Sequence, residues 1–222
     1  MVRHDVEAER EMWNRYAAAP KNNTGADREP VFEWTQWGSA HGPGIELLGA
    51  PVTVLDLGSG PGREAAYLAA RGMEVTGIDL SPVMVEAAAK RWAATRELRF
   101  VCAEVITYLS ASTKRWDAIY SSWGAVWFTD PEALLPLIAG HLSPGGRFVA
   151  AHAPAIPGAY GPQGTYGDGF KGRAHFHYRY AYTPRRWLSL MGRAGLVNPA
   201  AEVVPAPAAA DVGTLLLTAQ GA

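Results

Sequence analysis

The sequence predicts an α/β fold, with a doubly wound, mainly parallel sheet and helices on both of its faces. Three observations lead to this prediction. Apolar strand-like runs alternate with helical patterns of about a dozen residues, which is typical of βαβ units with right-handed crossovers. One such run, 52–56, continues directly into glycines at 58, 60 and 62, which marks a tight turn between a buried strand and a helix. The last two runs, 196–204 and 212–220, are joined by a short connection and should therefore pair antiparallel.

The expected helices begin at capping residues and end near glycines. Ser81-Pro82, Asp130-Pro131 and Thr183-Pro184 each combine a capping side chain with a proline suited to the first helical turn. Gly72 and Gly195 are expected to end the helices that precede them. An amphipathic pattern predicts a further short helix within the first twenty residues. The other helices are expected at 64–70, 81–93, 130–142 and 183–194.

The expected strands are short apolar runs with many β-branched or aromatic residues. They lie at 52–56, 73–78, 98–102, 116–122, 147–152, 196–204 and 212–220. Cys102, in the third of these strands, is expected to be a small buried hydrophobic residue.

Two glycine- and aromatic-rich segments do not fit the alternation of strands and helices. Segment 31–44 combines three aromatic residues, a histidine and three glycines, and should form either a packed plug or a lid. Segment 154–182 contains six glycines and five tyrosines. We expect it to be a long irregular loop, either a functional lid or disordered.

Length and charge exclude several classes of protein. The 222 residues fit one domain with a single core. A formal net charge of −1 gives no electrostatic footprint for nucleic acid or an anionic membrane, so we expect neither as a partner. The sequence shows no apolar run that approaches about 18 residues and no signal-peptide pattern. A single cysteine cannot form an internal disulfide. These observations favour a cytoplasmic protein, either a monomer or a homodimer.

The glycine turn is the most informative motif. A dinucleotide fingerprint requires glycine at its first, third and sixth positions. Counted from Gly58, the sixth position is Arg63, so a nicotinamide-dependent dehydrogenase is the least favoured reading. Glycines without side chains still allow a ligand to approach the main chain closely.

The nine residues Val54–Gly62 resemble the first motif of the class I S-adenosylmethionine-dependent methyltransferases. Later stretches resemble successive motifs of that class in the same order: 77–81, 100–104, 116–122 and 142–148. Stretches 121–131, 152–154 and 183–188 are similar to a small-molecule branch of it. The resemblance implies a seven-stranded sheet with the last strand antiparallel. It also implies four segments, a cap or lid (1–50), a cofactor-binding core (51–153), an acceptor-side loop (154–182), and a closing helix and strands (183–222).

The resemblance further implies S-adenosylmethionine as the cofactor and S-adenosylhomocysteine as the product. Asp56 would take the cofactor's ammonium, and main-chain N–H groups of the turn its carboxylate. Asp79 would accept both ribose hydroxyls, as an ionised carboxylate can. The sulfonium favours aromatic faces, so Tyr16 and Trp123 are expected beside it, and Trp13 or Tyr16 is expected to fold over the cofactor. The expected cofactor-binding residues are Trp13, Tyr16, Asp56, Gly58, Ser59, Gly60, Gly62, Asp79, Leu80, Met84, Ala103, Glu104, Val105, Ser121 and Trp123.

The acceptor is expected to be a small aromatic or apolar metabolite that is methylated on oxygen, nitrogen or carbon. If a general base is used, a neutral histidine suits that role near pH 7. His152 is the first candidate, His41 the second and His177 the third. The histidines lack metal-ligand spacing, and we expect no metal. The expected walls of the acceptor pocket are Trp34, Trp37, Trp127, His177 and Tyr178.

Two other functions stay open at this point. The same fold can belong to a catalytically silent cofactor-binding protein. An enzyme can also use this cofactor and break another bond at sulfur, for example by cyclising the amino-acid arm.

Overall fold

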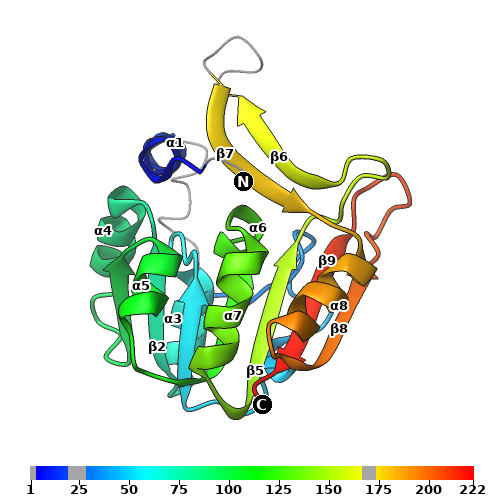
Figure 1. Cartoon of the computed structure of the whole chain (residues 1–222). Coiled ribbons are helices and arrows are strands. Elements are labelled where there is room, and N and C mark those ends of the chain that lie inside the picture. Colours follow the sequence, from blue (N-terminus) through cyan, green and yellow to red (C-terminus); the bar gives the residue numbers. More distant parts are fainter. Residues whose placement is uncertain (1–3, 20–28, 167–173) are drawn as a thin grey trace.

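The computed structural model describes residues 4–19, 29–166 and 174–222. These residues contain a seven-stranded sheet with helices packed on both faces (Figure 1), as the sequence predicts. The strands of this sheet are β1 (Thr53–Leu57), β2 (Glu74–Asp79), β3 (Leu98–Cys102), β4 (Trp116–Ser122), β5 (Leu142–His152), β8 (Val197–Val204) and β9 (Thr214–Gln220).

The strand order is β3-β2-β1-β4-β5-β9-β8. The pairs from β3 to β5 are all parallel, whereas β9 pairs antiparallel with both β5 and β8. The antiparallel last strand is thus confirmed. Strand order reverses between β1 and β4, and in open α/β sheets ligands bind at the carboxyl ends of the strands beside such a point.

The predicted helix starts are confirmed by their caps. Ser81 accepts a hydrogen bond from the Met84 N–H, and Thr183 accepts one from the Arg186 N–H. Asp130 accepts from the N–H of Glu132 in the same way. The helices are α1 (Val6–Ala18), the 3₁₀ helix η2 (Ile45–Leu48), α3 (Arg63–Ala69), α4 (Pro82–Arg91), α5 (Val105–Ala111), α6 (Ala125–Phe128), α7 (Pro131–His141) and α8 (Pro184–Arg193).

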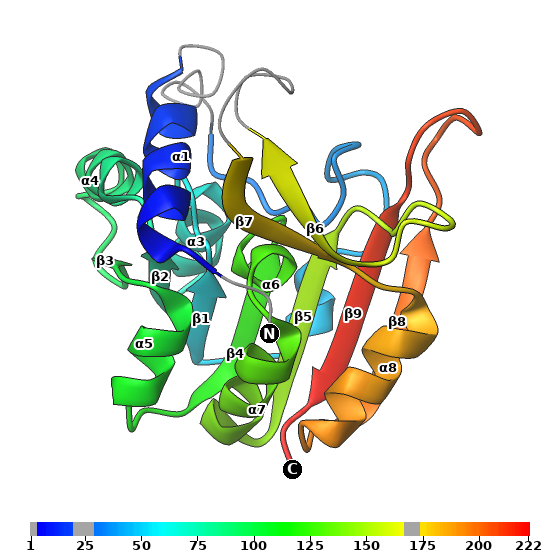
Figure 2. The ribbon, with the colours of Figure 1, turned by 45° about the horizontal axis from the view of Figure 1, so that its top comes forward.

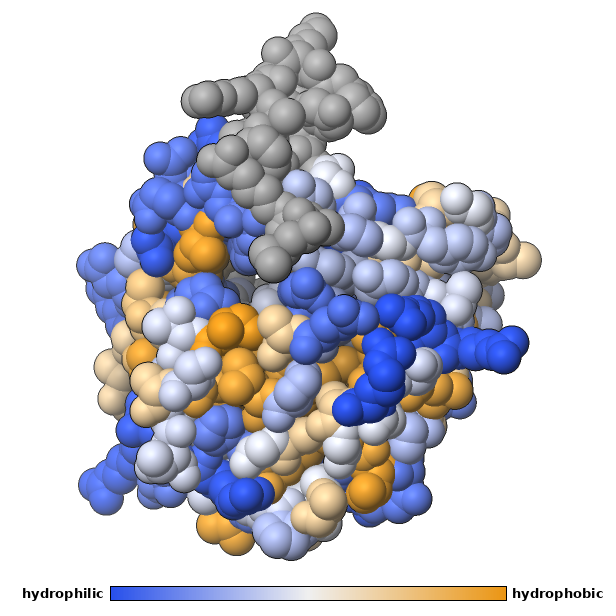
Figure 3. Space-filling model, in the orientation of Figure 1, coloured by the Kyte–Doolittle hydropathy of each residue, from blue (hydrophilic) through white to orange (hydrophobic). Residues whose placement is uncertain are grey.

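Two apolar layers hold the sheet. On one face, α5, α7 and α8 pack against Leu55, Ile119 and Phe148. On the other face, α3, η2 and the chain around Trp34 pack against Val54 and Tyr120. Apolar residues gather over α7 on the face shown in Figure 3, and hydrophilic residues gather over α8, where three arginines are exposed. No helix in the described parts of the chain has both the length and the apolar character that crossing a membrane requires.

Segment 31–44 is a plug and not a lid. The Trp34 side chain is only 1% exposed, and its indole N–H donates a 2.8 Å hydrogen bond to the Gly44 carbonyl. Its ring meets those of Phe32 and Tyr120 edge-on within the second apolar layer. Trp34 therefore belongs to the core, and its expected place in an acceptor pocket is wrong.

Segment 154–182 is more regular than expected. It contains an antiparallel hairpin of β6 (Gly161–Tyr166) and β7 (Ala174–Ala181), which lies beyond the carboxyl ends of the sheet strands (Figures 1 and 2). Residues 175–180 alternate polar and aromatic side chains with the period of two that a strand requires, and this pattern was overlooked among the glycines.

Helix α1 packs against β7 and α4, and Figure 2 shows it beside the carboxyl ends of β1 and β2. The Ser81 hydroxyl donates a 2.6 Å hydrogen bond to the side-chain oxygen of Asn14 and so ties α1 to the loop after β2.

Three helices, η2, α5 and α6, were not predicted from the sequence. Strand β5 begins earlier than predicted, at Leu142, which pairs with Trp116 ahead of a register shift. Cys102 is exposed because β3 is an edge strand.

Candidate functional site

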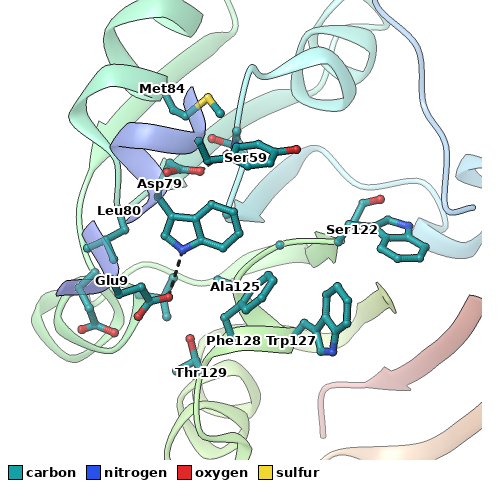
Figure 4. A pocket seen from close by; sticks show the side chains of 18 of the residues that line it. Glu9, Ser59, Asp79, Leu80, Met84, Ser122, Ala125, Trp127, Phe128 and Thr129 are labelled. Atoms are coloured by element: carbon teal, nitrogen blue, oxygen red, sulfur yellow. Dashed lines mark hydrogen bonds between the residues drawn. The ribbon is translucent and has the colours of Figure 1, made fainter. Parts of the chain in front are cut away.

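A cavity of about 420 Å³ lies between α1 and the carboxyl ends of β1, β2 and β4. Its volume is in the range typical of small-molecule sites. In Figure 4, Asp79, Leu80 and Met84 lie on one side of the cavity and Ser122 and Trp127 on the opposite side. The wall thus combines residues from the ends of two strands with residues from the helices and loops that follow them.

The glycine turn after β1 requires glycine for two different reasons. Gly58 has φ +83°, and a Cβ there would lie 2.5 Å from the Ala125 nitrogen, so the turn packs directly on the start of α6. Gly60 has φ +50°, and a Cβ there would meet nothing within 4 Å. Because Gly60 lines the cavity, this open space is where a ligand can approach the main chain.

Main-chain N–H groups of the turn already donate hydrogen bonds within the protein. The Gly58 and Ser59 N–H groups both donate to the Ile78 carbonyl, at 2.8 and 2.9 Å. The Gly62 N–H donates to the Ser59 carbonyl. Donation of these N–H groups to a ligand carboxylate, as expected from the sequence, therefore has no support in the geometry.

Asp79 ends β2 and is anchored by two main-chain N–H groups. Its Oδ2 accepts from the Gly60 N–H at 2.9 Å, and its Oδ1 accepts from the Ser81 N–H at 2.8 Å. Burial raises the pKa of this carboxyl, and these two hydrogen bonds, with a further one from the Leu80 main chain, oppose the shift. The first bond locks the glycine turn to β2, so the two motifs found in the sequence form one structure.

The position of Asp56 in β1 does not suit the cofactor-binding role expected of it. Within the described part of the chain it is absent from the cavity wall, and it is only 3% exposed. Its Oδ2 accepts a 2.8 Å hydrogen bond from the Tyr120 hydroxyl. Burial raises the pKa of Asp56 well above its usual value, against the lowering effect of the tyrosine. The structure assigns Asp56 to the interior between β1 and β4.

Glu64, in the first turn of α3, lines the cavity beside the glycine turn, although the sequence analysis did not select it. Burial raises its pKa to about 7, and the hydrogen bond from its own main-chain N–H opposes that shift. It is a carboxylate facing the cavity near the turn, where the sequence suggested Asp56.

The loop after β3 forms another part of the wall with Ala103, Glu104 and Val105, as expected. The Glu104 carboxylate caps α5, because Oε1 accepts from the Ile106 N–H at 2.9 Å and Oε2 from the Thr107 N–H at 2.7 Å. Capping holds this side chain at the wall.

An aromatic wall formed by Trp123, Trp127 and Phe128 lies after β4. Trp123 has φ +53°, an uncommon conformation for a bulky residue. Its N–H donates to the Ala151 carbonyl at 2.7 Å, and its indole N–H donates to the Trp34 carbonyl at 2.9 Å. These two bonds compensate the strained backbone and hold the ring at the cavity.

Comparisons with known proteins agree with this arrangement. A protein-family model described as a methyltransferase domain matches residues 54–146, which include the glycine turn, Asp79 and the aromatic wall. This match and the structures solved with S-adenosylhomocysteine support the resemblance of the sequence motifs to the class I S-adenosylmethionine-dependent methyltransferases.

Three similar proteins illustrate the range of similarity. The 1,6-didemethyltoxoflavin-N1-methyltransferase of Burkholderia thailandensis, solved with 1,6-didemethyltoxoflavin and S-adenosylhomocysteine, is 26% identical with a TM-score of 0.60, covering 80% of this chain and 74% of that one. The DhpI–S-adenosylhomocysteine complex shares the fold, at 16% identity and a TM-score of 0.64, over 97% of both chains. Trans-aconitate 2-methyltransferase of Methylobacterium radiotolerans is 39% identical over 111 residues, which are 47% of this chain and 41% of that relative.

Most residues expected to bind the methyltransferase cofactor meet at the cavity. Among the described residues, Asp56, Gly62 and Ser121 do not line it. Gly62 is covered by Phe100, and the Ser121 hydroxyl donates to the Leu57 carbonyl at 2.8 Å. The expected residues that do line the cavity are Trp13, Tyr16, Gly58, Ser59, Gly60, Asp79, Leu80, Met84, Ala103, Glu104, Val105 and Trp123.

The acceptor side was predicted less well. Trp127 lines the cavity, whereas Trp34, Trp37 and Tyr178 are absent from the wall in the described part of the chain. Trp34 and Trp37 belong to the plug, and Tyr178 packs against the first apolar layer. His177 lies in β7, but its side chain is outside what the structure describes.

His152 and His41 are also absent from the cavity wall in the described part of the chain. His152 is 1% exposed, stacks on Trp127 with ring centroids 5.5 Å apart, and has Nδ1 2.8 Å from the Ala153 carbonyl. Its Nε2 is buried without a hydrogen-bond partner in the described residues. Burial lowers its pKa to about 4. His41 Nε2 lies 2.7 Å from the Pro205 carbonyl, at the connection between β8 and β9.

Several wall residues were missed by the sequence analysis. On α1, Glu9 lines the cavity with Trp13 and Tyr16, and spacings of four and three residues place all three on one helix face. This spacing was a usable signal, whereas residues 122–129 owe their place to a four-residue helix with little periodicity. The missed residues are His4, Glu9, Pro61, Glu64, Ser122, Gly124, Ala125, Phe128 and Thr129.

Proposed function

We propose that the protein binds S-adenosylmethionine in the cavity and transfers its methyl group to a small aromatic or apolar molecule. The observation that carries this proposal is the Gly60–Asp79 hydrogen bond, which joins an open glycine turn and a strand-end carboxylate at one cavity. The chain spans only 41% and 38% of the lengths of two curated relatives that it matches, so the activity is proposed from the site itself.

The residues present fit the cofactor. Asp79 accepts from the main-chain N–H groups of Gly60, Ser81 and Leu80, and a carboxylate has about four acceptor sites, so it keeps acceptor capacity for a hydroxyl group. Leu80 and Met84 give an apolar surface next to it for a flat ring. Carboxylates along the wall suit a ligand that carries positive charge.

When bound, S-adenosylmethionine supplies a methyl group on a sulfonium, which a nucleophile displaces in line. The chain's share is to orient the two reactants and keep water away. Helix α1 covers the cavity, and Trp13 meets Phe128 with ring centroids 4.9 Å apart, so the lid contacts the aromatic wall directly. The aromatic faces favour a sulfonium and the transferring methyl group.

The aromatic wall also supports the proposed acceptor class. Trp123, Trp127 and Phe128 form continuous ring contacts at 5.8 and 5.1 Å. Ser122 and Thr129 beside them provide hydroxyl groups rather than charges. This surface suits a planar or apolar molecule with few charges.

Calorimetry with S-adenosylhomocysteine tests the proposal. We expect binding in the wild type and a loss of about 10- to 100-fold in Asp79→Asn, because hydrogen bonds to a charged group contribute about 1.5–3 kcal/mol. Glu86→Gln, at an exposed position of α4, is the matched control. Tight binding of NAD without binding of S-adenosylhomocysteine would overturn the proposal.

Turnover with methyl-labelled cofactor and a metabolite extract then identifies the acceptor. Label transferred to a small molecule supports methyl transfer. Cofactor that is bound but never consumed would instead indicate a silent cofactor-binding protein, and consumption with the label retained on a sulfur-containing fragment would indicate cleavage of another bond at sulfur.

A further inference from the structure

Four carboxylates line the cavity, and Glu64 is the one that other described residues leave without a hydrogen bond. Asp79 accepts from two main-chain N–H groups and Glu104 caps α5. Glu9 is paired with His4 and accepts from the Trp13 indole N–H at 3.2 Å. Glu64 accepts only from its own main-chain N–H. It is therefore the carboxylate whose lone pairs are free for a ligand.

The charges around Glu64 do not compensate it. Arg63 attracts the carboxylate, but the described residues form no ion pair between the two. Glu33, on the plug, repels it, and a charge on Asp56 would also interact unfavourably with a charge at this position. Glu64 is half-buried, and a carboxylate that is poorly solvated and unpaired would be stabilised by a cation in the cavity.

The position of Glu64 relative to the glycine turn identifies which part of a ligand it faces. Glu64 comes four residues after Gly60 and lines the cavity together with residues 58–61. Asp79 lines the same cavity and is joined to the turn through the Gly60 N–H. In a ligand whose hydroxyl groups reach Asp79 and whose chain passes the exposed main chain of Gly60, the end remote from the hydroxyl groups is therefore directed toward Glu64.

We propose that Glu64, and not Asp56, pairs with the ammonium group at the amino-acid end of S-adenosylmethionine. This inference rests on the proposed function. Asp56 has its lone pairs directed into the interior and is held there by Tyr120, whereas Glu64 faces the cavity without a partner from another residue.

The pairing has a consequence for protons. Because burial raises the pKa of Glu64 in the free protein to about 7, a substantial fraction of the molecules carries a proton on it at pH 7. An ammonium beside the carboxylate favours the ionised form, so binding should release that proton. Affinity for a ligand with the ammonium should therefore rise as the pH increases through 7.

The experiment compares S-adenosylhomocysteine with 5′-methylthioadenosine, which keeps the adenosine and thioether but lacks the amino-acid end. Calorimetry at pH 7 in two buffers of different ionisation enthalpy gives affinity and proton release together. For the wild type we expect proton release with S-adenosylhomocysteine and none with 5′-methylthioadenosine. Equal release with both ligands, or none with either, would overturn the inference without a variant being needed.

Two variants locate the proton. In Glu64→Gln we expect a 10- to 100-fold loss of affinity for S-adenosylhomocysteine, less than a roughly 2-fold change for 5′-methylthioadenosine, and no proton release. Asp56→Asn, the matched control, should retain both the preference and the release. The reverse result would assign the ammonium to Asp56. Wild-type protein that binds neither ligand would refute the proposed function itself, a different outcome from binding without discrimination.

Discussion

The hydroxyl of Tyr120 donates a 2.8 Å hydrogen bond to Oδ2 of Asp56, and both side chains are buried. The two residues lie on the neighbouring strands β4 and β1 and face the layer that contains Trp34. A carboxyl that the family motif made a candidate ligand is thereby part of the hydrophobic interior.

Asp56→Asn should make the fold less sensitive to pH. The pKa of Asp56 is raised in the folded state, so between its usual value near 4 and that raised value the folded protein binds more protons than the unfolded chain. Stability therefore falls as the pH rises through this window, and the Asn variant should lose that slope. Thermal unfolding at a series of pH values measures it, and identical slopes in both proteins would contradict the assignment. Tyr120→Phe should lower the free energy of unfolding by about 1–3 kcal/mol, because the carboxyl loses its partner.

Gly60→Ala and Gly58→Ala should separate binding from stability. At Gly60 the added methyl group enters open space at the cavity, so we expect weaker S-adenosylhomocysteine binding and a stability loss of only about 1–2 kcal/mol from the positive φ. At Gly58 it would lie 2.5 Å from the Ala125 nitrogen, and the loss of stability should be clearly larger. Thermal unfolding and calorimetry on both variants test this, and equal losses of stability would be inconsistent with the geometry.

His152 should remain neutral throughout the physiological range. Its pKa of about 4 predicts ring NMR shifts that do not change between pH 5.5 and 8. A lowered histidine pKa means that the unfolded chain binds more protons, so stability is present above about pH 6.5 and is lost as the pH falls toward 4, by up to about 3 kcal/mol. His152→Phe should abolish this loss and leave the pH–rate profile unchanged near neutrality. A profile that changes around pH 6–7 in that variant would restore His152 as a base.

Trp13→Ala should weaken S-adenosylhomocysteine binding by about 10-fold or more, since a large aromatic side chain contributes about 1.5–3 kcal/mol when it is buried against a ligand. Tyr16→Ala should have a smaller effect, because Tyr16 is 49% exposed. Glu11→Gln, at an exposed position of the same helix, serves as the control. Unchanged affinity in both aromatic variants would remove α1 from the cofactor site.

The parts of the site that sequence predicted well are those in which one stretch of chain fixes both the local conformation and the chemistry. The residues that make the turn after β1 are glycines because of their φ angles, and the same glycines open the main chain to a ligand. Asp79 ends a strand and is followed directly by the capped start of α4. Strand, turn and cap are local signals, and the order of the motifs predicted the seven-stranded sheet.

The direction of the Asp56 side chain in β1 could have been predicted correctly from the sequence. Val54 and Asp56 are two residues apart in β1 and therefore face the same side of the sheet, which here is the layer of α3 and the plug. The alternation was visible in the sequence, but the family motif was given more weight.

Other errors have a nonlocal cause. His152 stands at the end of β5, as predicted, yet the ring of Trp127 from α6 stacks on it, and Trp187 from α8 lies 5.4 Å away. Nothing in the sequence near His152 indicates these neighbours. The acceptor side is likewise built from α1, α6 and the residues around them, whose meeting depends on the whole sheet being formed.

The anchoring of the aromatic wall to the plug also bears on the order in which the protein folds. Ser122 donates to the Glu33 carbonyl and Trp123 to the Trp34 carbonyl, each across 89 residues of sequence. During synthesis the plug leaves the ribosome before β4, so these bonds can form only after β4 has also emerged. Closing so long a loop has an entropic cost. A nascent chain that stops before β4 has its glycine turn but not its cavity. Ligand binding by stalled chains of increasing length should therefore appear abruptly, at the length at which the residues after β4 can reach the plug.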